Sequence, residues 1–268
     1  MLIPVVIMLF VATKTRNIFA GILVGLTLGT ATGLIAGLFP FSAVFANDAA
    51  NNAATGFLID GVNGITDSSA YETAFAERDG KITGTPISPA GLMEKNPVEL
   101  DASRWELVLQ RGDILLGTHI PGGPGYEPER LKSSIQWAGD FFDRYFPEIP
   151  VKGFGSESWL YDPHLRLLLK ENANILKMQD QMYIYPIESG GGMMFRELFD
   201  GNDHPTDADC KSSLQRKALN RVRNGGQFTA SSMFILREDV AKVGSMPYGT
   251  AAQRADAVDR MNAYDCNP

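Results

Sequence analysis

Cysteine, histidine and positive charge are scarce in this chain of 268 residues. The two cysteines, Cys210 and Cys266, lie far apart and match neither a disulfide framework nor a metal-binding pattern. The three histidines are not at the spacing of zinc ligands, so the sequence predicts no metal site. Lysine and arginine total 24 against 31 aspartates and glutamates, a net charge of −7. This balance argues against a nucleic-acid partner, which needs a basic face to neutralise phosphates.

Charge is almost absent from residues 1–46, where only Lys14 and Arg16 are charged. A membrane-spanning helix needs ~20 mostly apolar residues, and residues 17–39 supply them. Glycine recurs at every fourth position from Gly25 to Gly37, on one helical face that a neighbouring helix can approach closely. We expect residues 1–66 to form a hydrophobic transmembrane-type segment of one or two helices, with membrane contact through residues 1–46.

Two other interpretations of this segment remain open. "SAVFA", ending at Ala46, is an acceptable signal-peptide cleavage site, although Lys14 and Arg16 follow an apolar run instead of opening the chain. A buried helix of a water-soluble domain is the second alternative, but so long an uncharged run is rare in such domains.

The N-terminal sequence also has a family resemblance. "MLIPVVIMLFVATKTRNIFAGILVGLTLGTATGLIAGLF", followed by "GFLIDGVNGI", resembles the start of a sodium/proton antiporter of the NhaC type. The similarity stops near Asp67, and the part of such a transporter that carries its ion site has no counterpart in the sequence. We therefore do not expect transport by this chain alone.

From residue 67 onward the composition is that of an ordinary globular domain. Residues 115–120 form an apolar run that predicts a strand, and a glycine-rich loop follows it. Apolar residues at helical spacing predict a helix over residues 128–145, with Pro128 in its first turn. Three further strands and two helices are indicated in "VKGFGSESWLYD", "PHLRLLLKENAN", "QMYIYPIES", "DADCKSSLQRKALNRVRNGG" and "QFTASSMFILRE". This order predicts a mixed α/β domain over residues 67–248 with one main sheet, followed by a polar tail, residues 249–268, that is a frayed helix or disordered.

The loop between the first strand and the long helix is the candidate anion site. Gly122, Gly123 and Gly125 permit backbone conformations that deliver N–H groups to a helix N-terminus, where an anion is favoured. The loop is neither a Walker loop nor a dinucleotide fingerprint. On local sequence alone, a simple strand-to-helix connector is an equal alternative.

Two side chains are candidates for general base catalysis. His119 ends the strand beside the loop, and a histidine there can titrate near neutral pH. Glu157 lies in the polar cluster "SESWLYDP". A structural histidine bonded to the loop is the alternative for His119, and a Ser158/His119/Asp162 triad lacks a nucleophile elbow. Asp162 is better explained as the cap of the helix that starts at Pro163. The basic side chains considered for phosphate contact are Lys132, Arg216, Arg221 and Arg223.

Several ordered motifs carry a second family resemblance. "GDILLGTHIPGGPGY", "SSIQWAGDFFDRYFPE", "SESWLYDPHLRLLL", "NANILKMQDQMYIYP" and "SLQRKALNRVRNGGQF" resemble the GNAT-like C-terminal domain of a bacterial acyltransferase family, over about residues 70–248. The resemblance implies an α+β fold with a mixed sheet, and acyl-CoA as co-substrate, with acetyl-CoA first among acyl groups. It places the CoA pyrophosphate on Gly122, Gly123, Gly125 and Tyr126. Two departures stand out: Pro124 removes an N–H donor from the loop, and the helical domain that precedes this half in the family has no counterpart.

The sequence therefore predicts an N-acyltransferase that transfers an acyl group from acyl-CoA to a small-molecule amine, with His119 or Glu157 as base. The alternatives are a non-catalytic, membrane-anchored binding module, or a truncated antiporter/acyltransferase fusion without activity. Lys14 and Arg16 should stay on the cytoplasmic side, which would place residue 67 onward outside, away from cytoplasmic acyl-CoA. We expect membrane association if the segment inserts, and a cytoplasmic protein otherwise.

Overall fold

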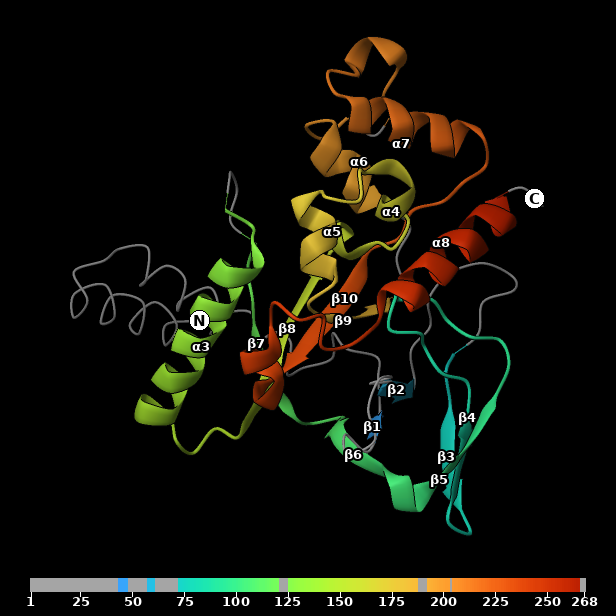
Figure 1. Ribbon diagram of the computed structural model, residues 1–268. Helices are drawn as coiled ribbons and strands as arrows, with labels where there is room; N and C mark the ends of the chain where they lie inside the picture. Colours follow the sequence, from blue (N-terminus) through green and yellow to red (C-terminus); the bar gives the residue numbers. More distant parts are fainter. Residues whose placement is uncertain are drawn as a thin grey trace.

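A four-stranded main sheet with the order β7-β8-β10-β9 forms the centre of the molecule (Figure 1). The computed structural model describes residues 43–47, 57–60, 72–120, 125–187, 192–202 and 204–265. The main-sheet strands are β7 (Ile114–Gly117), β8 (Val151–Ser158), β9 (Tyr183–Pro186) and β10 (Ser231–Leu236). β7 and β8 are parallel, whereas β10 is antiparallel to both β8 and β9. The prediction of a mixed α/β domain is confirmed, including the order strand, loop, helix, strand, helix and two further strands.

Helix α3 (Pro128–Tyr145) makes the crossover from β7 to β8 and has the predicted bounds. Its buried face consists of Ile135, Gly139 and Phe142. Gly139 faces Phe154 of β8, which lies 3.8 Å from where a Cβ would stand, an ordinary van der Waals distance. Pro128 suits the first turn because its missing N–H would have no partner there.

Short helices gather at the end of the sheet that β8 runs toward (Figure 1). They are η3 (Trp159–Tyr161), α4 (Leu165–Leu168), α5 (Asn174–Gln179), α6 (Gly192–Leu198), η4 (Asp207–Asp209) and α7 (Ser213–Arg223). Their apolar faces form a cluster of their own, which includes Leu165, Met194 and Phe228. Ser212 and Gln215 cap α7 reciprocally, which explains where the sequence "KSSLQRK" begins its helix.

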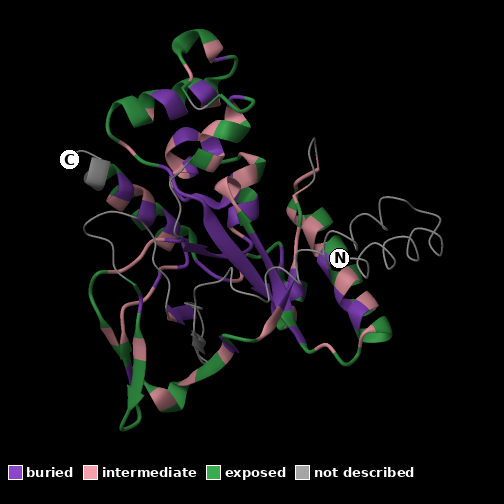
Figure 2. Ribbon diagram, turned by 180° about the vertical axis from the view of Figure 1, so that it is seen from behind, coloured by how far each residue is buried: buried purple, intermediate pink, exposed green. Residues whose placement is uncertain are grey.

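Two small sheets lie on the opposite side. One has the order β2-β1-β6, from β1 (Ala43–Asn47), β2 (Phe57–Asp60) and β6 (Trp105–Gln110). The other is the meander of β3 (Phe75–Arg78), β4 (Lys81–Gly84) and β5 (Val98–Asp101), where η2 (Ala102–Arg104) follows. Figure 2 shows that this meander is largely exposed while the main sheet is buried.

The second strand, β2, belongs to the main core. The Phe57 ring packs edge-on against Tyr183 and Phe234, with centroids 5.3 and 5.4 Å apart, and the Tyr183 hydroxyl donates to the Phe57 carbonyl. Residues 43–47 and 57–60, which lie inside the predicted transmembrane-type segment, therefore form strands that pair with or pack on the rest of the domain.

None of the helices among the described residues is long and apolar enough to cross a membrane. The predicted span, residues 17–39, lies outside those residues. Its helix and its membrane contact stay predictions.

The C-terminal tail forms helix α8 (Ala251–Asp265), where the sequence left a frayed helix and a disordered segment open. Arg254 is buried, and its Nε lies 2.9 Å from the Asp180 carboxylate. Arg260 makes two bonds to the Glu94 carboxylate, at 2.7 and 3.0 Å. These charged contacts, together with the buried Ala257 and Met261, hold the helix against the domain.

Candidate functional site

Both predicted catalytic residues lie at one edge of the main sheet. Gly117 of β7 is in register with Gly155 of β8, and the Thr118 N–H donates to the Gly155 carbonyl at 2.8 Å. His119 and Glu157 each follow that glycine pair by two residues. The parallel strands therefore bring the two positions to the same, carboxyl, edge, where open α/β sheets place their ligands.

Glu157 lies near the end of β8. Its side chain lies at the surface, but partial burial by its neighbours raises the pKa of the carboxyl. Glu157 is in register with Ser232, and Ser232 with Tyr185, so the three residues form a row across β8, β10 and β9. Burial raises the pKa of the Tyr185 phenol well above its usual value, and the nearby Glu157 charge adds to the effect.

His119 is exposed just beyond β7. In the part of the chain that the structure describes, it makes no hydrogen bond or ion pair. The loop residues 121–124 lie outside the described residues, so the alternative of a structural histidine bonded to the loop stays open. His119 stays a candidate on its position alone.

The candidate anion loop is described in part. Gly122, Gly123 and Pro124 lie outside the described residues. Gly125 has a φ of 126°, a conformation that L-residues with a side chain rarely adopt. Among the described residues, the N–H groups of Gly125 and Tyr126 have no hydrogen-bond partner, and both directly precede α3, at whose N-terminus an anion is favoured.

Arg130 is a basic residue at the loop that the sequence analysis missed. Its Nη1 lies 2.9 Å from where a Cβ on Gly125 would stand, so the guanidinium packs over the loop backbone. It is exposed, and its ion-pair partner Glu127 is 3.8 Å away. Its place in the first turn of the helix after the loop was the signal that could have found it.

The four basic residues proposed from sequence are engaged elsewhere. Lys132 donates to the Ala241 carbonyl at 2.6 Å. Arg216 donates to the Cys210 carbonyl and Arg221 to that of Gln227, and Arg223 pairs with Asp207. The contacts of these four side chains hold the fold together.

Four hydroxyl groups meet behind the loop. The Tyr126 hydroxyl donates to that of Tyr161 at 3.4 Å. The hydroxyls of Ser156 and Thr118 lie close enough to the Tyr161 phenol to lower its pKa, against the larger effect of burial. We call Thr118, Tyr126, Ser156 and Tyr161 the hydroxyl cluster.

The Ser158/His119/Asp162 triad is not formed. The Asp162 carboxylate is fully buried and accepts from the N–H of Thr229 at 2.7 Å, from the N–H of His164 at 2.9 Å and from Nδ1 of His164 at 2.8 Å. The Ser158 hydroxyl accepts from the N–H of Leu160 and caps η3. Both side chains therefore fix the chain where β8 ends.

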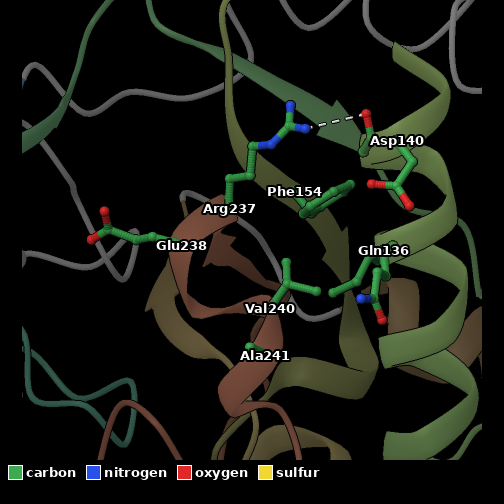
Figure 3. A pocket seen from close by; sticks show the side chains of 9 residues that line it. Gln136, Asp140, Phe154, Arg237, Glu238, Val240 and Ala241 are labelled. Carbon is green, nitrogen blue, oxygen red and sulfur yellow. Dashed lines mark hydrogen bonds between the residues drawn. The ribbon is translucent and has the colours of Figure 1, made fainter. Parts of the chain in front are cut away.

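A shallow pocket of about 190 Å³ lies elsewhere, between α3 and η5 (Arg237–Lys242) (Figure 3). Arg237 crosses its mouth, donates to the Gly139 carbonyl at 3.3 Å and pairs with Asp143. β10 ends at Leu236, which is in register with Gly153 near the start of β8. The pocket is thus at the opposite edge of the sheet from Glu157 and is not the predicted site.

The strand–loop–helix–strand unit, with its loop and polar residues at the carboxyl edge, defines the chain as a GNAT-type α/β domain. The chain belongs to the family described as GNAT-like C-terminal domain, which matches residues 48–235. The match begins earlier than the start near residue 70 that the motifs indicated, and it includes β2. No curated protein matches the chain.

Solved structures of acyltransferases show a more distant likeness. One, in complex with decanoyl-CoA, is 22% identical over 60% of this chain and 45% of its own, with a TM-score of 0.42. Another, with decanoyl-CoA and teicoplanin, is 23% identical over 57% of this chain and 44% of its own, with a TM-score of 0.43. The chain thus spans less than half the length of either. The matched family and structures are not antiporters, so the antiporter resemblance of the N-terminal segment stays a prediction.

Proposed function

We propose that this chain carries an acyl-CoA-dependent N-acyltransferase domain, which transfers an acyl group to the amine of a small molecule. Membership of the GNAT-like family supports the proposal. The observation that carries it is the arrangement at the carboxyl edge of β7 and β8. There, the N–H groups of Gly125 and Tyr126, which have no hydrogen-bond partner among the described residues, lie on the sheet edge at which Glu157 has a raised pKa.

The loop of residues 122–126 is the proposed binding site of the CoA pyrophosphate. It precedes α3, whose N-terminus carries the positive end of the helix dipole. The Arg130 guanidinium over Gly125 adds a full positive charge. A backbone N–H at the end of β7 is the proposed donor to the thioester carbonyl, where negative charge develops during attack.

Glu157 is the proposed general base, with His119 as the competing candidate. The amine nitrogen attacks the thioester carbonyl, the new C–N bond forms and the C–S bond breaks. The proton that the amine loses passes to the base, and the CoA thiolate takes up a proton to leave as a thiol. No covalent enzyme intermediate is needed, so catalysis rests on orientation and one oxyanion donor.

The test measures binding and turnover on the full chain. Calorimetry follows a series from acetyl-CoA, which the family resemblance implies, to decanoyl-CoA, which is bound in the solved acyltransferases. Thiol release is then measured with and without a primary amine. We expect saturable binding and amine-dependent thiol release, and a kcat loss of ~10²–10⁴-fold in Glu157→Gln.

Control variants and the wild-type measurements show which residue is the base and whether the domain is an enzyme or a binding module. Glu77→Gln changes an exposed carboxylate on β3 and should leave kcat unchanged. A large loss in His119→Gln with little change in Glu157→Gln would reverse the assignment of the base. Binding without thiol release would establish the binding module instead, and no heat with any acyl-CoA would overturn the proposal.

This function also requires the domain to face cytoplasmic acyl-CoA. The proposed membrane contact is through residues 1–46. Protease accessibility of the domain in sealed inside-out and right-side-out vesicles distinguishes the two orientations, and carbonate-resistant pelleting tests insertion.

A further inference from the structure

We infer that the hydroxyl cluster positions the loop for acyl-CoA, with Tyr161 as the positioning residue and Tyr126 as the group it holds. The inference rests on the proposed function and names residues that act through the loop. None of the four needs to touch the reacting atoms.

The cluster joins four separate segments at the candidate edge. Thr118 follows β7, Ser156 is in β8, Tyr161 is in η3, and Tyr126 closes the loop before α3. Tyr161 is 1% exposed, accepts from the Tyr126 hydroxyl at 3.4 Å, and has the Thr118 and Ser156 hydroxyls close by. Thr118 also donates to the Gly155 carbonyl at 3.4 Å, which ties the cluster to the glycine pair between β7 and β8.

The cluster is neutral over the range in which an enzyme works. Burial raises the pKa of the Tyr161 phenol and raises that of Tyr126 well above its usual value. Both phenols therefore remain protonated, and each hydroxyl can donate one bond and accept others. Neutral hydroxyls add no negative charge beside the loop that is to receive a pyrophosphate.

The bond between Tyr126 and Tyr161 favours one position of Tyr126 over others. A buried hydroxyl that loses its partner costs about 1–3 kcal/mol, so moving Tyr126 away is penalised at both ends of its bond. Tyr126 directly follows Gly125, whose φ of 126° sets the turn. Holding these residues in place before the ligand arrives reduces the ordering cost of binding.

The test compares three phenol deletions in the full chain. Tyr161→Phe and Tyr126→Phe remove the bond at either end. Tyr183→Phe is the matched control, because its buried hydroxyl also makes bonds, at 2.6 Å to the carbonyls of Phe57 and Ile87, but in another part of the core. The acyl-CoA Kd by calorimetry, KM, kcat and the melting temperature are measured for each.

We expect Tyr161→Phe and Tyr126→Phe each to raise the Kd and KM for acyl-CoA about five- to tenfold, with kcat within about twofold. The Kd of the double variant should be about that of the weaker-binding single variant, because both substitutions remove the same bond. Tyr183→Phe should lower the melting temperature and leave Kd unchanged.

The outcomes separate the two claims. Wild-type chain that binds no acyl-CoA overturns the proposed function and this inference together. Wild-type binding with an unchanged Kd in Tyr161→Phe and Tyr126→Phe overturns only the inference. A rise in Kd that is as large in Tyr183→Phe also overturns it, because general loosening of the core would then explain the effect.

Discussion

Tyr161 and Asp162 are neighbours in sequence, and both are buried polar residues at the end of β8, yet their partners differ in kind. Asp162 accepts from two backbone N–H groups and from the His164 ring. Tyr161 accepts from the Tyr126 hydroxyl of the candidate loop and lies close to the hydroxyls of Thr118 and Ser156. The two backbone donors of Asp162 can change only if the backbone moves, whereas the contacts of Tyr161 can change by movement of side chains.

The difference shows how one short segment can serve stability and function at once. Thr229 leads into β10, so its bond to Asp162 ties the β8–α4 connection to the neighbouring strand. Tyr161 instead faces the loop before α3. Substitutions at Asp162 should therefore act on the fold, and substitutions around Tyr161 should act on the ligand.

The largest effect is expected from Asp162→Ala. It leaves the N–H of Thr229 and the N–H and ring of His164 without their acceptor in a fully buried place. We expect a loss of about 3–5 kcal/mol in the free energy of unfolding, measured by urea denaturation. Asp162→Asn keeps one acceptor oxygen and should lose less. An Asp162→Ala protein as stable as wild type would show that Asp162 does not stabilise the fold.

The second prediction concerns the pH dependence of turnover at Glu157. Its pKa is raised in the folded chain by burial, so the carboxyl stays protonated to a higher pH than an ordinary glutamate. A base works only when ionised, so kcat/KM should fall as pH drops through that raised pKa and level off above it. The acid limb should vanish in Glu157→Gln, together with most of the rate.

The contribution of Glu157 to folding stability should change with pH in the opposite direction to its contribution to turnover. A folded pKa above the unfolded value favours the protonated form in the native state, so its contribution is present at low pH and is lost as pH rises. Glu157→Gln should therefore not lower the melting temperature at neutral pH. If Glu157→Gln lowered the melting temperature at neutral pH, Glu157 would act on the stability of the fold, as Asp162 does.

A smaller effect is expected from Gly125→Ala. The φ of 126° strains any side chain, and the new Cβ would stand 2.9 Å from Arg130. We expect a loss of about 1–3 kcal/mol in stability and a weaker Kd for acyl-CoA. Gly112→Ala is the matched control, because Gly112 also has a positive φ, of 101°, but no atom within 4 Å of the new Cβ. A similar Kd in the two variants would show that the loop backbone does not bind the ligand.

The parts of this site that were predictable from sequence are local. The stripe of apolar residues and Pro128 gave the bounds of α3, and the glycine-rich loop was found from its composition. The hydroxyl cluster was missed because Tyr126 and Tyr161 are 35 residues apart, and nothing in either segment indicates the other. The packing of helix α8 on the domain was not predictable for the same reason: Arg260 pairs with Glu94 across 166 residues. Long-range pairing of polar side chains leaves no periodic pattern in a sequence.

The smallest effect is expected from His164→Ala, and it tests the comparison most directly. The substitution removes the 2.8 Å bond from the ring to Asp162 and leaves the carboxylate its two backbone donors. We expect a loss of about 1 kcal/mol in the free energy of unfolding and no change in kcat, measured beside wild type at one pH. A buried aspartate oriented toward a histidine Nδ1 is also an arrangement used in catalysis. A kcat loss of tenfold or more with intact stability would therefore show that Asp162 and His164 act in catalysis and not only in stabilising the fold.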